Sequence, residues 1–247
     1  MKIGITAVAA LILLAAPAEA ATSFSADIFT GFGKASGSVK NYDFGGAALV
    51  SFDKLQTQLG ISDTHSSVSP FSFDLIKFDG DFFVRDRKGT VGLTIGQDSF
   101  RKGGASGIFT FLGDASVTSY GAFGEWYMRN SVTLKFSGGG YSGDAKGFYL
   151  GTDAAWYVTP DIALDFGYHY LRMTSVGNQS AINLGAEYMP WESLPLSLGL
   201  TYSHVSVSPG GSGSTYGLSL KYRFGTTGSL VARDRSGPIS WNGALPI

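Results

Sequence analysis

One stretch near the C-terminus shows the pattern that dominates this chain, an apolar side chain at every second position. Tyr216, Leu218, Leu220, Tyr222 and Phe224 alternate with glycine, serine and cationic side chains. Successive side chains of a β-strand point to opposite faces of the sheet, so this segment is predicted to form a strand with one wholly apolar face. The same alternation recurs at residues 132–137, 148–156, 162–170 and 194–202.

Strands of this kind follow one another from residue 24 onward, and no segment has a helical period. The pattern predicts about twelve strands, with ten as the alternative. They cover residues 24–33, 42–52, 55–63, 71–85, 89–100, 116–128, 131–142, 147–158, 162–173, 180–189, 194–206 and 215–224. An even number of antiparallel strands can close into an up-and-down barrel, whose first and last strands pair and leave no edge.

The connections between these strands alternate in length. Those at residues 52–54, 85–88, 129–130, 159–161 and 190–193 are tight, whereas the others, including "SDTHSSVSP" and "SPGGSGS", are longer and rich in glycine and serine. Short turns on the periplasmic side and longer loops outside are typical of an outer-membrane barrel. Both ends of the chain are then expected in the periplasm.

Alternation alone does not say whether lipid or a protein core covers the apolar face, because a soluble barrel alternates too. Composition favours lipid: only 15% of the 247 residues are charged, and the polar faces carry mainly Gly, Ser and Thr. A water-facing exterior carries many more charges. Aromatic side chains also gather where strands enter the tight turns, as in the girdle of a membrane interface. The predicted interface aromatics are Phe52, Trp126, Trp156, Tyr188, Trp191, Tyr222 and Phe224, with Phe83, Tyr127 and Tyr157 at the same level.

The two ends of the chain differ from the barrel. Residues 1–20 combine Lys2, an apolar run and an Ala18-Glu19-Ala20 site, the pattern of a cleaved secretory signal peptide. The barrel is expected at residues 21–224. Residues 225–247 are rich in Gly, Ser and Pro and contain an Arg233-Asp234-Arg235 cluster. They are expected to lie loosely in the periplasm, with a plug or a contact with peptidoglycan as weaker alternatives.

The residues also resemble a known group. "YGLSLKYRFG" resembles the closing strand of Gram-negative outer-membrane β-barrel proteins, and the runs 121–173 and 182–205 are similar to uncharacterised porin-family proteins of alphaproteobacteria. The resemblance implies insertion by the barrel-assembly machinery, which would read Tyr222 and Phe224. It also implies an outer-membrane location, against lipid and lipopolysaccharide. One departure is that this chain continues for 23 residues beyond Phe224.

Charged side chains on the inward face form a predicted belt in the periplasmic half of the lumen. Cross-strand pairing places Glu125 near Lys135, Lys135 near Asp153, and the acids of the next strands beside each other. Closure of the barrel would bring Asp27 close to Arg223. The belt comprises Asp27, Asp81, Glu125, Lys135, Asp153, Asp165, Glu187, Lys221 and Arg223. Because carboxylates outnumber cations, an open lumen would favour cations; a purely structural salt-bridge network is the alternative.

Catalysis and cofactor binding find little support in the sequence. His169 and Asp165 share a face but lie about 13 Å apart along a strand, too far for an acid–base dyad. Three histidines and no cysteine leave no metal constellation, and a net charge of −1 without a basic patch argues against nucleic acid. No cofactor and no catalytic residue is predicted.

The function expected from the sequence is passive passage of small polar solutes or ions through an outer-membrane barrel. The alternative is a closed structural barrel that supports envelope integrity or surface interaction. An outer-membrane hydrolase is a weaker third possibility, since nothing in the sequence marks a paired serine and histidine.

Overall fold

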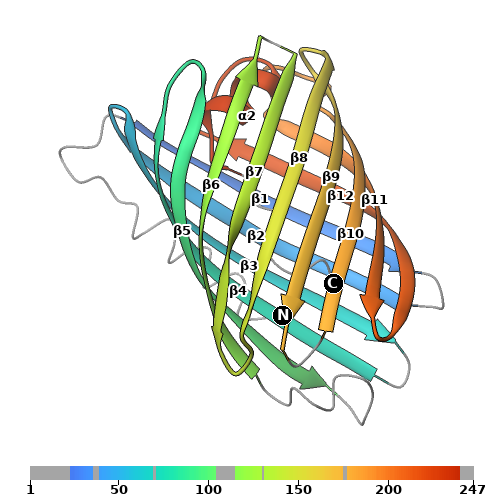
Figure 1. The fold of residues 1–247 in the computed structure, drawn as a ribbon. Helices are drawn as coiled ribbons and strands as arrows, with labels where there is room; N and C mark the ends of the chain where they lie inside the picture. The colour runs from blue at the N-terminus through green and yellow to red at the C-terminus, as the bar shows by residue number, and fades with distance from the viewer. Residues whose placement is uncertain are drawn as a thin grey trace.

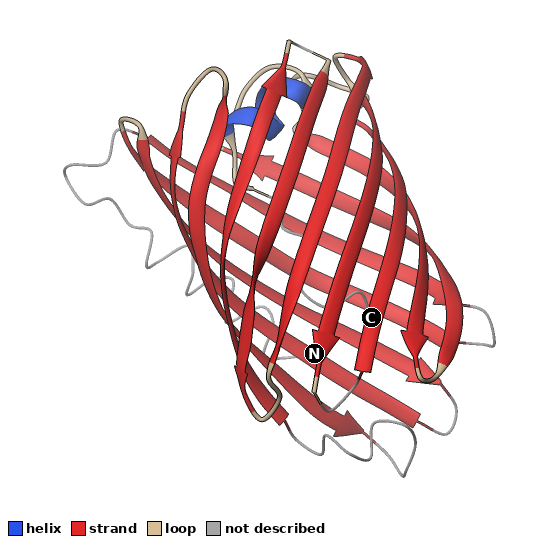
Figure 2. Cartoon of the chain, viewed as in Figure 1, coloured by secondary structure: helices blue, strands red, loops and turns tan. Residues whose placement is uncertain are grey.

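The computed structural model describes residues 23–35, 39–68, 71–103, 115–129, 131–174 and 177–239. Within these residues the chain forms twelve strands and one short helix, α2 (Leu230–Ser236), as Figures 1 and 2 show. The strands are β1 (Ser23–Ala35), β2 (Val39–Phe52), β3 (Leu55–Val68), β4 (Phe71–Arg85), β5 (Gly89–Gly103), β6 (Ala115–Met128), β7 (Val132–Gly143), β8 (Gly147–Thr159), β9 (Ile162–Met173), β10 (Gly177–Tyr188), β11 (Leu196–Ser208) and β12 (Gly211–Phe224). The predicted signal peptide lies outside the described residues.

The strands close into one antiparallel barrel, in which each strand pairs with its sequence neighbours and β1 pairs with β12. The seam between β1 and β12 is in register from Ala26 opposite Phe224 to Ala35 opposite Thr215. Closure gives the backbone N–H and C=O groups of both end strands a partner, which they would lack in a bilayer. The predicted twelve-stranded barrel is confirmed, and the alternative count of ten is wrong.

Side-chain exposure alternates along the strands and shows which face points outward. On β6, Phe123 and Glu125 are buried inside the barrel, whereas Tyr120 and Trp126 are exposed on its outer face. The outer face carries large apolar side chains that are more than half exposed, among them Val91, Leu93, Leu150 and Leu200. An apolar surface that surrounds a whole barrel fits lipid and not water. No helix in the described ranges is long and apolar enough to cross a membrane.

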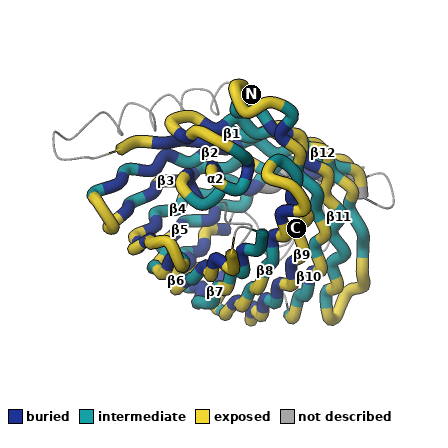
Figure 3. Tube along the Cα trace, turned by 90° about the horizontal axis from the view of Figure 1, so that it is seen from above, coloured by how far each residue is buried: buried dark blue, intermediate teal, exposed yellow. Residues whose placement is uncertain are grey.

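The connections that the sequence predicts to be tight all lie at the end of the barrel that holds helix α2, called here the tight-turn end. The turns comprise residues 53–54, 86–88, 129–131, 160–161 and 189–195. Hydrogen bonds tie α2 directly to this end: Val231 donates its backbone N–H to Pro160, and Arg235 binds the backbone carbonyl of Arg129. Seen along the barrel in Figure 3, α2 lies within the ring of strands.

The predicted interface aromatics divide between the two faces of the wall. Trp126, Trp156, Tyr188, Trp191 and Phe224 are exposed near the tight-turn end, and Phe52 and Tyr222 are half-buried. Phe83, Tyr127 and Tyr157 are buried inside the barrel instead, so the prediction that they share the outer ring is wrong. The reason is the strand period of two, which turns the neighbour of each outward aromatic into the lumen.

Most of the loops predicted to be long are shorter in the structure. β3 extends to Val68 and β12 begins at Gly211, so most of "SDTHSSVSP" and "SPGGSGS" belongs to strands. Backbone pairing does not require apolar side chains, and strands that continue past the bilayer can be polar on both faces. The connection between β5 and β6, residues 104–114, lies outside the described residues. The other connections at this end have two or three residues each, so the predicted difference in loop length is not seen in them.

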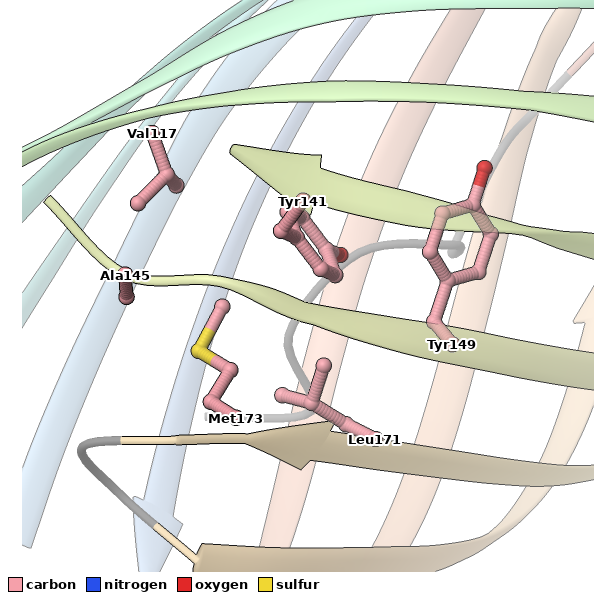
Figure 4. Close-up of a cluster of buried hydrophobic side chains, with 6 residues drawn as sticks. All are labelled: Val117, Tyr141, Ala145, Tyr149, Leu171 and Met173. Atoms are coloured by element: carbon pink, nitrogen blue, oxygen red, sulfur yellow. The ribbon is translucent and has the colours of Figure 1, made fainter. Parts of the chain in front are cut away.

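Apolar side chains also pack inside the barrel. At the end opposite α2, a cluster joins strands β6 to β9 and the β7–β8 turn, as Figure 4 shows; its members are Val117, Tyr141, Ala145, Tyr149, Leu171 and Met173. A second cluster packs Leu230 of α2 against Tyr157, Ala163 and Met189. The barrel interior is therefore partly filled with side chains from the wall and from the tail.

Candidate functional site: the charged lumen

A charged row crosses strands β6, β7 and β8 inside the barrel. Glu125 lies opposite Lys135, and their side chains approach to 3.6 Å; Lys135 in turn lies opposite Asp153. The short β6–β7 turn at residues 129–131 fixes this register, since one connection of defined length determines which residues face each other. The structure therefore places the first half of the predicted belt as the sequence indicates.

Arg223 is the centre of a second charged group, at the seam of the barrel. Its guanidinium lies 2.7 Å from carboxylate oxygens of both Glu187 and Asp234, and it donates to Ser197 Oγ at 2.8 Å. Asp27 lies directly opposite Arg223 across the β1–β12 pairing. Only 4% of the Arg223 surface is exposed, so these carboxylates balance a buried charge. Lys221 adds a longer contact of 3.9 Å to Glu187.

The three acids Asp153, Asp165 and Glu187 do not sit side by side as predicted. Asp153 faces Gly167, and Glu187 faces Ala163, so neither lies opposite Asp165. Asp165 lies opposite Ala155 on β8 and opposite Gly185 on β10, two residues along the strand from Asp153 and from Glu187. All three still face the lumen, where Asp165 interacts electrostatically with Lys135 and Glu187.

His169 is the partner that the sequence did not assign to Asp153. Its Nε2 atom lies 2.8 Å from Asp153 Oδ1, and the ring is buried on the lumen face. Ser137, the hydroxyl residue on the far side of Gly151, has no hydrogen-bond partner, so His169 is not paired with a nucleophile there. Across the described ranges, no group of three His, Cys, Asp or Glu residues is arranged to hold a metal ion.

A further acidic group lies on β4 and β5. Asp81 faces inward on β4, as predicted, and Asp79 shares that face; Asp98 faces inward on β5 opposite Lys77. Asp81 and Asp98 are fully buried, and Gln58 donates to Asp81 at 3.0 Å. Asp98 is absent from the belt predicted from the sequence. The available signal was that Asp98 shares the inward positions of β5 with Gly92 and Gly96, at intervals of two and four residues.

The C-terminal tail is not loose over residues 225–239, which corrects the expectation from its composition. Asp234 accepts hydrogen bonds from Arg223 and from the Tyr157 hydroxyl, at 2.7 and 3.1 Å. The Arg235 guanidinium lies over the Tyr127 ring, 4.9 Å from its centroid. The sequence singled out the Arg233-Asp234-Arg235 cluster but named no partners for it, because those partners lie on strands distant in sequence.

Comparisons with known proteins bear on the fold of the barrel. No family model and no curated protein matches the chain. Among solved structures, the KdgM porin matches with a TM-score of 0.57 and 11% identity, covering 79% of this chain and 98% of that chain. The NanC porin matches with a TM-score of 0.58 and 8% identity, with the same two coverages. At these identities the likeness is one of architecture, and the chain has the barrel fold of the KdgM and NanC porins.

Proposed function

We propose that this chain is an outer-membrane channel through which small polar solutes and ions pass passively, with a preference for cations. The observation that carries the proposal is the sign of the charges on the inner face. Inward carboxylates outnumber inward cations; the acids are Asp27, Asp43, Asp79, Asp81, Asp98, Glu125, Asp153, Asp165 and Glu187, against Lys77, Arg85, Lys135, Lys221 and Arg223. Rings of acidic side chains favour cations in pores.

The likeness to solved porins supports this assignment through the shared fold. One of those solved structures is the KdgM porin in complex with disordered oligogalacturonate. The lining of the present barrel favours cations, so a polyanionic sugar is not the solute that we propose here. Small cations and polar neutral solutes fit the acidic lumen better.

The outer face supports an outer-membrane location. The exposed apolar band would contact lipid, and the aromatic side chains near the tight-turn end would meet the lipid headgroups on the periplasmic side. Lipopolysaccharide would surround the opposite rim. Tyr222 and Phe224, whose rings lie 4.5 Å apart at the end of β12, would be presented to the assembly machinery.

A closed structural barrel is the second candidate, and one observation favours it. Helix α2 and the residues that follow it occupy the lumen at the tight-turn end. A barrel filled in this way could support the envelope without transport. Single-channel recording of the refolded mature protein in planar bilayers separates the candidates, because folded protein without conductance steps would contradict the channel.

Asp165 offers the clearest test of cation preference. Its side chain is exposed to the lumen, and no described side chain lies within salt-bridge distance of it. We expect Asp165→Asn to lower the cation-to-anion permeability ratio, measured from the reversal potential in a salt gradient, with little change in stability. Asp86→Asn, on the exposed β4–β5 turn, removes the same charge outside the lumen and serves as the control. An unchanged ratio in Asp165→Asn would contradict the proposed ion path.

A further inference from the structure

We propose that residues 225–239 form a resident plug that gates the tight-turn mouth of the channel. This inference rests on the proposed channel function and adds the element that controls it. The chain leaves β12 after Phe224 and re-enters the barrel, so a segment outside the membrane-spanning strands lies across the path of any solute. Gly225 allows the reversal: its φ is +71°, and a Cβ atom there would lie 2.3 Å from the Phe24 carbonyl oxygen.

The first anchor of the plug is helix α2, which contacts one side of the barrel wall. Arg235 donates to the Val132 carbonyl at 2.8 Å and to Thr133 Oγ1 at 3.2 Å, both at the start of β7. Arg233 is buried and donates to the carbonyl of Glu192 in the β10–β11 turn at 2.8 Å. The arginines therefore cap backbone carbonyls of two different tight turns.

The second anchor lies across the lumen, on β3 and β4. The Gln58 side-chain amide binds the Ile239 backbone twice: its Nε2 donates to the Ile239 carbonyl at 2.9 Å, and its Oε1 accepts from the Ile239 N–H at 2.7 Å. Arg85 donates to the Gly237 carbonyl at 2.8 Å. The Ile239 side chain packs against Leu49, Phe83 and Phe123, so it is held by apolar contacts as well.

Together the two anchors make the segment span the lumen. One end is held by Arg223 on β12 and Tyr157 on β8, and the other by Gln58 and Arg85 on β3 and β4. Strands β3 and β4 lie far around the ring from β8 in the strand order, so a chain that reaches both crosses the interior. A segment held only along one wall would contact neighbouring strands alone, whereas this one contacts β8 and β12 as well as β3 and β4.

The contacts of the plug are of a kind that can be exchanged for water without opening the barrel. They are hydrogen bonds, the ion pair of Arg223 with Asp234, and the apolar side chains of Leu230 and Ile239. The Val231 N–H bonds to Pro160 in the β8–β9 turn, but no backbone ladder joins the described residues 225–239 to a strand. The linker before α2 contains two glycines with positive φ, Gly225 and Gly228, and the N-cap residue Ser229 makes no side-chain cap hydrogen bond. The structure thus joins a cooperative barrel to a separately held segment that can leave it.

The primary test compares conductance of the full chain with that of a chain ending at Phe224. We expect the full chain to give small or infrequent steps, and the truncated chain to give stable steps several-fold larger. A heat-modifiable gel shift and a β-rich circular dichroism spectrum establish that both are folded. Equal conductance in the two proteins would contradict the proposed plug but not the proposed channel function. A folded truncated barrel that gives no conductance steps would contradict the proposed channel function, and with it the proposed gate.

Point variants test the same proposal without removing any residue. We expect Gln58→Leu and Arg235→Ala to raise the frequency of large steps, because each releases one anchor. Ser236→Ala is the matched control, since that exposed hydroxyl bonds only to the Ala232 carbonyl within α2. Frequencies in Gln58→Leu and Arg235→Ala equal to that of Ser236→Ala would overturn the assigned anchors.

A cross-link tests whether the segment must move. The natural sequence has no cysteine, so an Ile239→Cys, Leu49→Cys pair can be joined selectively by a short bis-thiol reagent or a disulfide. We expect the joined protein to lack the large steps and, for the disulfide, reduction to restore them. The single variants Ile239→Cys and Leu49→Cys are the controls, because each carries one substitution and cannot form the link. Large steps from fully joined protein would show that solutes pass with the segment in place, and would overturn the gate.

Discussion

Arg223→Ala is expected to lower the free energy of unfolding of the barrel by about 3–5 kcal/mol, the range typical of breaking a buried ion pair. The guanidinium contacts Glu187 and Asp234 at 2.7 Å and lies opposite Asp27. Its removal would leave three carboxylates near one another without their shared cation, at the seam that closes the barrel. The measurement is chemical unfolding in detergent micelles or vesicles, followed by the gel shift of the folded form.

Two further variants make this expectation specific. Lys146→Ala removes a cation from the exposed β7–β8 turn and is expected to leave stability unchanged. A triple variant, Arg223→Ala with Glu187→Gln and Asp234→Asn, is expected to recover part of the loss because the uncompensated charges are gone. If Arg223→Ala were as stable as Lys146→Ala, the seam group would contribute nothing to closure.

Leu200→Arg is expected to destabilise the barrel by about 2–4 kcal/mol, whereas Thr201→Arg, one residue further, is expected to have little effect on stability. Leu200 is 60% exposed on the outer face of β11, and Thr201 lies on the inner face. An arginine in the lipid face must leave water, while an arginine in the lumen can remain hydrated and would reduce cation passage.

Unfolding in lipid vesicles and reversal potentials, measured on both variants, separate these effects. Because the two positions are adjacent, differences in strand position and backbone pairing are almost eliminated. Equal destabilisation by Leu200→Arg and Thr201→Arg would mean that lipid does not contact the apolar face. The proposed membrane location of the barrel would then be wrong.

The sequence predicts the barrel well because strand period and turn residues are local properties. Alternation over residues 216–224 determines which side of β12 is apolar, and the short turn at residues 129–131 determines that Glu125 meets Lys135. Closure extends this reasoning to one distant pair, Asp27 and Arg223, which the structure places opposite each other.

The position of Asp165 and the contacts of the C-terminal tail depend on irregular pairing and on distant residues, which the sequence pattern does not show. The pairing of β8 with β9 shifts register between Tyr157 and Thr159 and places Asp165 opposite Ala155, two residues from Asp153; an irregular turn of this kind has no distinct sequence signature. The tail was missed for a different reason. Its partners, such as Gln58 for Ile239, lie 181 residues away, and only the closed barrel brings them within reach.

The buried position of Ile239 has a practical consequence for work with this protein. Its backbone is bonded to Gln58 inside the barrel, so the segment that carries it is held within the lumen. A fused partner that pulled on this segment would break the bonds of Ile239 to Gln58 and its packing against Leu49, Phe83 and Phe123. Recordings from such a fusion would describe an altered protein, and affinity tags are better inserted in the exposed turn at Pro209 and Gly210, at the opposite end.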